Sequence, residues 1–144
     1  MADSASWFTW ALLSAVFAAL TAVLAKLGVQ SVDPDLATLL RTAVVIVVLS
    51  CIVFGSGKWR SPTELDSKTL LFLSLSGLAT GASWLCYFRA LKLGDASRVA
   101  PVDKFSVVLV AVFAFLFLAE RPSMRDWIGI CLIAAGVVFL AIRA

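Results

Sequence analysis

An adjacent acid and base, Asp103 and Lys104, stand near the start of a nearly uninterrupted apolar run over residues 99–118. A run of that length can cross a bilayer as a helix. Each charge placed in hydrocarbon costs about 2.5–3.5 kcal/mol, so charges inside a span normally face other helices, water or a substrate path. Neighbouring residues lie about 100° apart on a helix, so we expect these two side chains to find partners elsewhere and not each other. The pair predicts a substrate or proton path, with Asp103 as the acid that would carry a proton.

Further polar and aromatic side chains enter the apolar segments at the same end as this pair. Arg41 stands roughly 8 Å into its segment, and Lys26 and Arg89 stand near the ends of theirs. For Lys26 and Arg41 two interpretations stay open, because a long basic side chain can reach the headgroups or face a path. We predict that Arg41 and Arg89 lie at the entrance of the path and that Trp84 and Tyr87 form an aromatic wall. Ordinary charged helix ends in one headgroup layer would give the same pattern.

Five apolar segments are expected to position these side chains. Hydrophobic residues make up 62% of the 144 residues and charged residues 15%, with a mean hydropathy of +1.02, whereas soluble domains are about 45–50% apolar and 25% charged. The predicted helices cover about residues 7–27, 36–54, 70–91, 99–118 and 127–142. These segments predict an all-α, polytopic membrane protein with one transmembrane domain over residues 1–144. Asp33-Pro34-Asp35 predicts a break and a helix cap, and Pro101 is expected in the first turn of its helix.

Small residues recur at helical spacing in two of these segments. Gly77 and Gly81 form a GxxxG element, and Ser14, Ala18 and Ala22 form a row on another predicted helix. Such residues let helix backbones approach closely in a membrane. We predict that both sets lie at helix-packing faces. Residues 1–6 lack a basic region, so the first apolar segment is expected to serve as an uncleaved insertion signal.

Composition excludes several functional classes. The chain has no His, and its three Cys lie far apart, which excludes His-based proton relays and leaves no metal-binding spacing. We find no paired nucleophile and base and no phosphate-binding loop, so we expect neither an enzyme nor a cofactor or metal. The net charge of +3, without a block of like charges, predicts no nucleic-acid partner.

Basic residues divide almost evenly between the two sides of a five-helix topology. One side holds Lys58, Arg60, Lys68, Arg121 and Arg125, and the other holds Lys26, Arg41, Arg89, Lys92, Arg98, Lys104 and Arg143. The difference is too small to fix one orientation by the positive-inside rule. Either the chain inserts both ways up and forms antiparallel dimers, or some charges on the second side are functional.

The sequence from Trp84 to Val102 resembles the EamA domain of the drug/metabolite transporter superfamily. Phe117 to Ser123 leading into Trp127-Ile128-Gly129 has the same resemblance, as has the segment Trp10 to Leu27 followed by a turn and Arg41. Members commonly have ten helices in two inverted five-helix repeats, with a site at the repeat interface. This chain has one repeat and is similar to the short five-helix prokaryotic branch. The four-helix small multidrug resistance branch uses a Glu in its first helix, and the first predicted helix here has no acid.

The resemblance implies a secondary transporter that exports or exchanges small metabolites or drugs across the prokaryotic cytoplasmic membrane. It implies a second repeat, which an antiparallel homodimer would supply, and membrane lipids and a small-molecule substrate as further partners. A non-transporting accessory or assembly subunit, paired with a different protein, is the alternative. The cations at the expected entrance favour an anionic or zwitterionic substrate.

Overall fold

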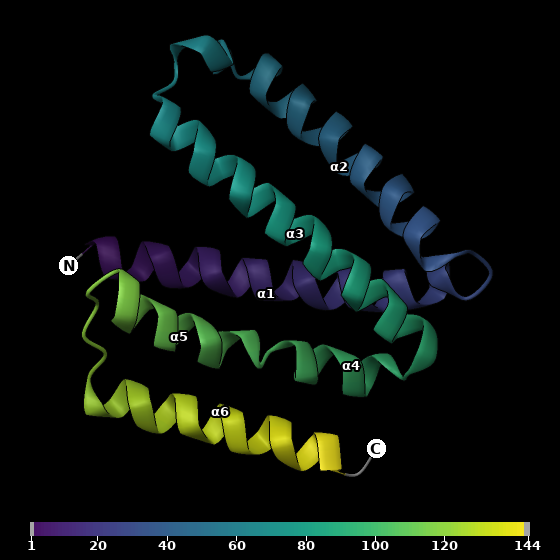
Figure 1. The fold of residues 1–144 in the computed structure, drawn as a ribbon, viewed down its shortest axis with the longest axis vertical. Coiled ribbons are helices and arrows are strands. Elements are labelled where there is room, and N and C mark those ends of the chain that lie inside the picture. The colour runs from purple at the N-terminus through teal and green to yellow at the C-terminus, as the bar shows by residue number, and fades with distance from the viewer. Residues whose placement is uncertain (1, 143–144) are drawn as a thin grey trace. The chain divides into compact units, whose positions relative to one another are not determined.

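Helices form the regular structure of the chain, and five of them are long and apolar enough to cross a membrane. The computed structural model describes the backbone of residues 2–142 and the side chains of residues 7–142 (Figure 1). The candidate spans are Trp7–Val29, Pro34–Gly55, Ser67–Leu93, Ala96–Phe117 and Met124–Ile142. The all-α membrane fold expected from the sequence is confirmed. Arg143, which was counted among the charges of one side, lies outside the described residues.

Most large apolar side chains point away from the rest of the chain. Trp10 is 71% exposed and Phe117 is 79% exposed, which an aqueous protein rarely tolerates over so many residues. The buried residues are Ala22, Val29, Thr38, Phe88, Leu91, Ala114 and Val137. The exposed apolar faces suit contact with lipid chains, so the helices need few tight contacts with one another.

The chain divides at Leu93 into two compact units. The first contains α1 (Ala2–Val29), α2 (Pro34–Gly55), a short 3₁₀ turn η1 (Pro62–Glu64) and α3 (Ser67–Leu93). Within this unit α3 packs against both α1 and α2 (Figure 1). The three helices meet at the end where α1 and α3 finish and α2 begins, and Lys26, Asp35, Arg89 and Lys92 lie at that end.

The start of α2 lies in the segment Asp33-Pro34-Asp35, for which the sequence predicted a break and a cap without naming the capping residue. The Oδ1 atom of Asp33 accepts hydrogen bonds from the backbone N–H groups of Asp35 (2.9 Å) and Leu36 (3.2 Å), and Pro34 takes the first helical position. The helix therefore begins at Pro34, two residues before the expected start at residue 36. This difference matters because it brings Asp35 inside the span.

The second unit contains α4 (Ala96–Asp103), α5 (Ser106–Phe117) and α6 (Met124–Ile142). Within this unit α6 packs against both α4 and α5. Ser123 and Asp126 cap α6 reciprocally: the backbone N–H and hydroxyl of Ser123 each lie 2.7 Å from the carboxylate of Asp126, and the N–H of Asp126 donates back to the hydroxyl at 3.3 Å. The helix begins at Met124 and not at the expected residue 127.

The expected helix over residues 99–118 is interrupted, and Pro101 does not lie in its first turn. Because α4 begins at Ala96, Pro101 is inside the helix, where it has no N–H to donate to the carbonyl one turn earlier. The following backbone tightens into three-residue hydrogen bonds, from Lys104 to Pro101 and from Phe105 to Val102, each 3.0 Å. The helix ends at Asp103 and restarts at Ser106, so the acid and base stand at a break.

Candidate functional site

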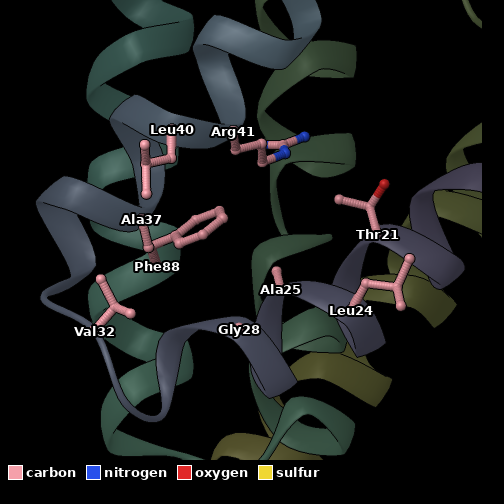
Figure 2. Close-up of a pocket in the computed structure, with 9 residues that line it drawn as sticks. All are labelled: Thr21, Leu24, Ala25, Gly28, Val32, Ala37, Leu40, Arg41 and Phe88. Atoms are coloured by element: carbon pink, nitrogen blue, oxygen red, sulfur yellow. The ribbon is translucent and has the colours of Figure 1, made fainter.

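A pocket of about 390 Å³ lies within the first unit, among α1, the α1–α2 turn, α2 and α3 (Figure 2). Its lining residues are Thr21, Leu24, Ala25, Gly28, Val32, Ala37, Leu40, Arg41 and Phe88. The volume lies near the lower end of the range for small-molecule sites, and an apolar wall with few polar groups is typical of them. Leu24 and Leu40 are 66% and 57% exposed, so the pocket is open and not sealed.

Arg41 provides the charge of this pocket. Its guanidinium carbon lies 4.1 Å from the ring centroid of Trp84 and 5.7 Å from that of Phe88, both on α3. These distances are within the range of cation–π attraction, which strengthens away from water. Figure 2 shows the side chain extending from α2 towards the side of the pocket where Thr21 of α1 lies. The structure therefore brings together the predicted Arg41 and Trp84 and directs Arg41 into a pocket and not away from it.

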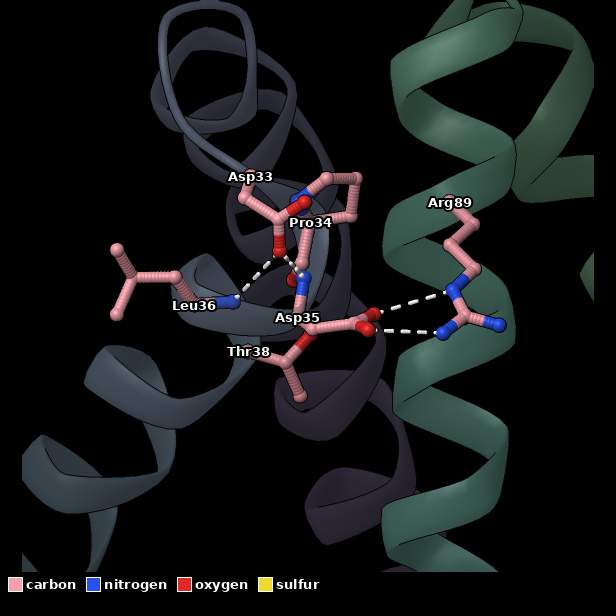
Figure 3. A network of polar contacts seen from close by, with 6 residues as sticks. All are labelled: Asp33, Pro34, Asp35, Leu36, Thr38 and Arg89. Atoms are coloured by element: carbon pink, nitrogen blue, oxygen red, sulfur yellow. Dashed lines mark hydrogen bonds and ion pairs between the residues drawn. The ribbon is translucent and has the colours of Figure 1, made fainter.

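Arg89 is bound by Asp35, which was not among the predicted site residues. Arg89 donates from Nε to Oδ1 (3.0 Å) and from Nη2 to Oδ2 (2.8 Å), which makes a bidentate ion pair between α3 and α2 (Figure 3). Both side chains are exposed, at 60% and 51%. Asp35 was missed because the span was expected to begin after it. The role predicted for Arg89 at the path entrance stays a prediction, and its observed contact is structural.

Two lysines bind the carbonyl ends of each other's helices. Lys26 of α1 donates from Nζ to the carbonyl of Leu91 near the end of α3, at 2.7 Å. Lys92 of α3 donates to the carbonyl of Val29, the last residue of α1, at 2.8 Å, and to those of Gln30 and Val32 in the following turn, at 2.6 and 3.1 Å. The last carbonyls of a helix lack partners within it and carry partial negative charge, so an ammonium group suits both positions. Neither interpretation of Lys26 included this role.

Asp103 and Lys104 form an ion pair with each other, contrary to the expectation that adjacent residues would not meet. The Lys104 amine lies 3.4 Å from Oδ2 of Asp103, with side chains 55% and 36% exposed. The expectation assumed a continuous helix, but α4 ends at Asp103 and Lys104 belongs to the break. Both residues belong to the second unit and the pocket to the first, so a path shared with Arg41 stays a prediction.

The remaining predicted residues occupy varied positions. Tyr87 is half-buried on α3, between Trp84 and Phe88 in sequence, and does not line the pocket. Of the small residues on α1, Ala22 is buried whereas Ser14 and Ala18 are exposed. A Cβ atom added at Gly77 or Gly81 would meet no atom within 4 Å. Within residues 7–142 the glycines are thus not used for close contact, and their packing role stays a prediction. The described residues contain no group of three Cys, Asp or Glu side chains suited to a metal.

Comparison with known sequences identifies the family. The sequence model of the EamA-like transporter family matches residues 5–142. A Sinorhizobium sp protein described as "Uncharacterized transporter in cobO 3'region" is 59% identical over 139 residues, which cover 96% of this chain and 99% of that protein. "Uncharacterized transporter YxxF" of Bacillus subtilis (strain 168) is 26% identical over 145 residues, 96% of this chain but 43% of the relative.

A partial similarity involves a protein whose name states an assembly. "Probable 4-amino-4-deoxy-L-arabinose-phosphoundecaprenol flippase subunit ArnE" of Yersinia pestis (strain Pestoides F) is 30% identical over 84 residues, 58% of this chain and 74% of that protein. No solved structure matches the chain. The family match covers nearly the whole chain, and five helices can span a bilayer. The protein is therefore a multi-pass membrane transporter of the bacterial inner membrane and belongs to the EamA-like transporter family.

Proposed function

We propose that the chain is a secondary transporter that exports or exchanges small metabolites or drugs across the cytoplasmic membrane. The observation that carries this proposal is the open pocket of the first unit, where Arg41 stacks on Trp84. A charged group inside a span is costly and is normally kept for a substrate or ion. An apolar pocket with one fixed cation offers a solute both apolar contacts with its walls and a specific charged contact.

The break between α4 and α5 supports a second part of the same path. Interrupted helices commonly form the binding sites of secondary transporters, because their ends expose backbone groups at membrane depth. Asp103 and Lys104 stand at this break, and their ion pair is half-exposed. We propose that these two residues of the second unit, and Arg41, Trp84, Tyr87 and Arg89 of the first unit, contribute to the substrate or proton path.

The proposed working form is an antiparallel dimer, with residues 1–144 acting as one five-helix repeat. The Bacillus relative supports this form, because the chain aligns over 96% of its own length but spans only 43% of that transporter. A longer relative can carry two such repeats in one polypeptide, whereas this chain needs a second copy. The nearly even division of Lys and Arg between the two sides permits insertion in both orientations.

An accessory subunit is the second candidate function. The similarity to ArnE favours it, because that protein is named as a subunit of a flippase. In this case the pocket would be completed by a different protein, and the chain alone would not transport.

Reconstitution of the purified chain tests the choice between these functions. Proteoliposomes that contain only this chain are loaded with a panel of radiolabelled amino acids, organic acids and sugar phosphates, and exchange is measured against empty liposomes. Exchange that is lost in an Asp103→Asn, Arg41→Gln double variant supports the transporter. Exchange of no compound by the chain alone, with recovery when a co-purified protein is added, supports the accessory subunit and contradicts the transporter.

Topology mapping tests the dimer. Reporters that are active on only one side of the membrane are fused to the C-terminus, one in each of two strains. Activity of both reporters supports insertion in two orientations and hence the antiparallel pair. Activity of one reporter alone contradicts an antiparallel homodimer.

A further inference from the structure

The basic side chains at the meeting point of α1, α2 and α3 differ in whether they form hydrogen bonds or ion pairs within the protein. Lys26 and Lys92 donate to backbone carbonyls, and Arg89 is held by Asp35. Arg41 forms ring contacts and, within residues 7–142, neither a hydrogen bond nor an ion pair. Three of these four cations therefore need no ligand, whereas Arg41 retains its full capacity to donate.

The ring contact of Arg41 leaves the N–H donors of its guanidinium available for hydrogen bonds. The contact with Trp84 is a cation–π contact, with the guanidinium carbon 4.1 Å from the ring centroid, and none of the N–H donors of the group forms a hydrogen bond within residues 7–142. In-plane donors match the two oxygen atoms of a carboxylate or phosphate and bind them with paired, charge-assisted hydrogen bonds. The aromatic ring thus holds the guanidinium in place without consuming its donors.

A second polar group stands across the pocket from Arg41. Thr21 of α1 lines the pocket, and its hydroxyl forms no hydrogen bond within the described residues. By contrast, the hydroxyls of Thr38 and Thr42 on α2 donate to carbonyls one turn earlier, at 2.8 and 2.7 Å. Figure 2 shows Thr21 on the side towards which Arg41 extends. Both side chains therefore line the same pocket, and each has donors for an anionic group bound there.

We propose that this pocket binds an amphipathic organic anion, with a single carboxylate or phosphate group at Arg41 and Thr21. The apolar body of the ligand would lie against Leu24, Val32 and Leu40, which line the rest of the pocket. A volume of about 390 Å³ accommodates one molecule of metabolite size. As the identity of a transported substrate, this assignment rests on the proposed function; as a binding site, it stands on the pocket alone.

Contact quenching of Trp84 fluorescence tests the site directly. The probe is 11-bromoundecanoate, whose bromine quenches tryptophan at contact, and the matched neutral probe is 11-bromoundecanol. The protein carries Trp84 as its single tryptophan, with Trp7, Trp10, Trp59 and Trp127 replaced by Phe. Saturable quenching by the acid, at concentrations at least about tenfold below those needed for the alcohol, is expected from a charge-assisted contact. Equal quenching by the two probes would overturn the proposal.

Variants assign the effect to the two polar groups. Arg41→Gln is expected to weaken binding of the acid by about tenfold or more, and Thr21→Val by roughly threefold. Arg60→Gln, in the exposed loop before η1, removes an equal charge and is expected to change nothing. Unchanged binding of the acid in Arg41→Gln contradicts the proposal. If that variant does not fold, Thr21→Val and the comparison of acid with alcohol still decide it.

Nanodiscs distinguish a lipid headgroup from a free metabolite as the source of the anion. The titration is repeated in phosphatidylcholine alone and in phosphatidylcholine with phosphatidylglycerol. Competition by the anionic lipid supports the site and identifies lipid phosphate as an occupant, whereas undiminished binding supports a free anion. Arg41-dependent binding without exchange in proteoliposomes sustains this inference and removes transport by the chain alone. Exchange in proteoliposomes that depends neither on Arg41 nor on ligand charge supports transport by the chain alone and contradicts this inference.

Discussion

The guanidinium of Arg89 donates two hydrogen bonds to the carboxylate of Asp35, at 3.0 and 2.8 Å, across the contact between α3 and α2. Arg41 follows Asp35 by six residues on α2, and Trp84 precedes Arg89 by five on α3. At 1.5 Å per residue these separations are roughly 9 and 7.5 Å along the two helices. The ion pair and the Arg41–Trp84 contact therefore join the same two helices, α2 and α3, less than two turns apart.

Breaking this ion pair is expected to loosen the stack. Asp35→Asn or Arg89→Gln removes the pairing and should lower the unfolding temperature in detergent and alter Trp84 fluorescence in the single-tryptophan protein. The exchanged pair, Asp35→Arg with Arg89→Asp, restores opposite charges at the same positions. We expect partial recovery, because a cation in the first turn of α2 opposes the helix dipole. Losses that simply add in the exchanged protein would contradict a positioning role.

The reciprocal lysine contacts predict a selective loss of stability. Replacing Lys92 by Met keeps its apolar stem but leaves the carbonyls of Val29, Gln30 and Val32 without this donor. Hydrogen bonds to a charged group contribute about 1.5–3 kcal/mol, so we expect a loss of this order in denaturant titrations. Lys58→Met, in the loop after α2, is the matched control and should change stability by less than about 0.5 kcal/mol. Equal losses in the two variants would show that the helix-end contacts contribute nothing.

Within the described residues of one chain, the GxxxG face of α3 contacts no other helix at Gly77 and Gly81, so its packing against a second chain can be tested by substitution. A Cβ atom added at Gly77 or Gly81 meets no atom within 4 Å, and we expect Gly77→Leu with Gly81→Leu to leave the single chain folded, which its unfolding temperature in detergent checks. If a second copy packs on this face, the same change abolishes the dimer seen by crosslinking in mild detergent. Leu78→Ala, at a 71% exposed neighbour, is the control. A dimer that survives the double change excludes these glycines from its interface.

Hydropathy and local signals were sufficient to predict the membrane fold. Four of the expected spans correspond to one helix each and the span over residues 99–118 to α4 and α5 together, and the cap at Asp33 depends on a short side chain that can accept from the first N–H groups. The starts of α2, α3, α4 and α6 were placed two or three residues too late, which moved Asp35 out of its span and Pro101 into a first turn. The interruption at Lys104 was missed for the same reason. A proline is tolerated in the first turn of a helix but disrupts the helix further in, where Pro101 lies.

Contacts between helices could not be read from the sequence in the same way. Lys26 and Lys92 bind backbone carbonyls, and a carbonyl is present at every residue, so no residue type marks the acceptor. For Arg41 the sequence left two interpretations open, and its contact with the Trp84 ring was not predicted, although a cation well inside a span has few tolerable environments. The sequence therefore indicated which charges were unusual, whereas only the packing of α1, α2 and α3 separates the cations that are satisfied from the one that is available.

The break between α4 and α5 predicts that transport depends on Asp103. The carboxylate stands at the last residue of α4, 36% exposed and 3.4 Å from the Lys104 amine, so it is accessible to a solute or proton. Asp103→Asn keeps the size of the side chain and removes its charge. We expect exchange in proteoliposomes to fall below about a tenth, since a lost charged hydrogen bond of 1.5–3 kcal/mol corresponds to at least that factor. Membrane insertion and the unfolding temperature should be unchanged.

The matched control is Asp95→Asn, at the other end of α4, where the carboxylate forms no capping hydrogen bond. Asp103→Glu provides the rescue, because it restores the charge with one additional methylene group. Exchange that is retained in Asp103→Asn, or lost equally in Asp95→Asn, would remove Asp103 from the mechanism. In that case the interruption after Pro101 has a structural cause alone, and the search for the coupling group moves to the pocket of the first unit.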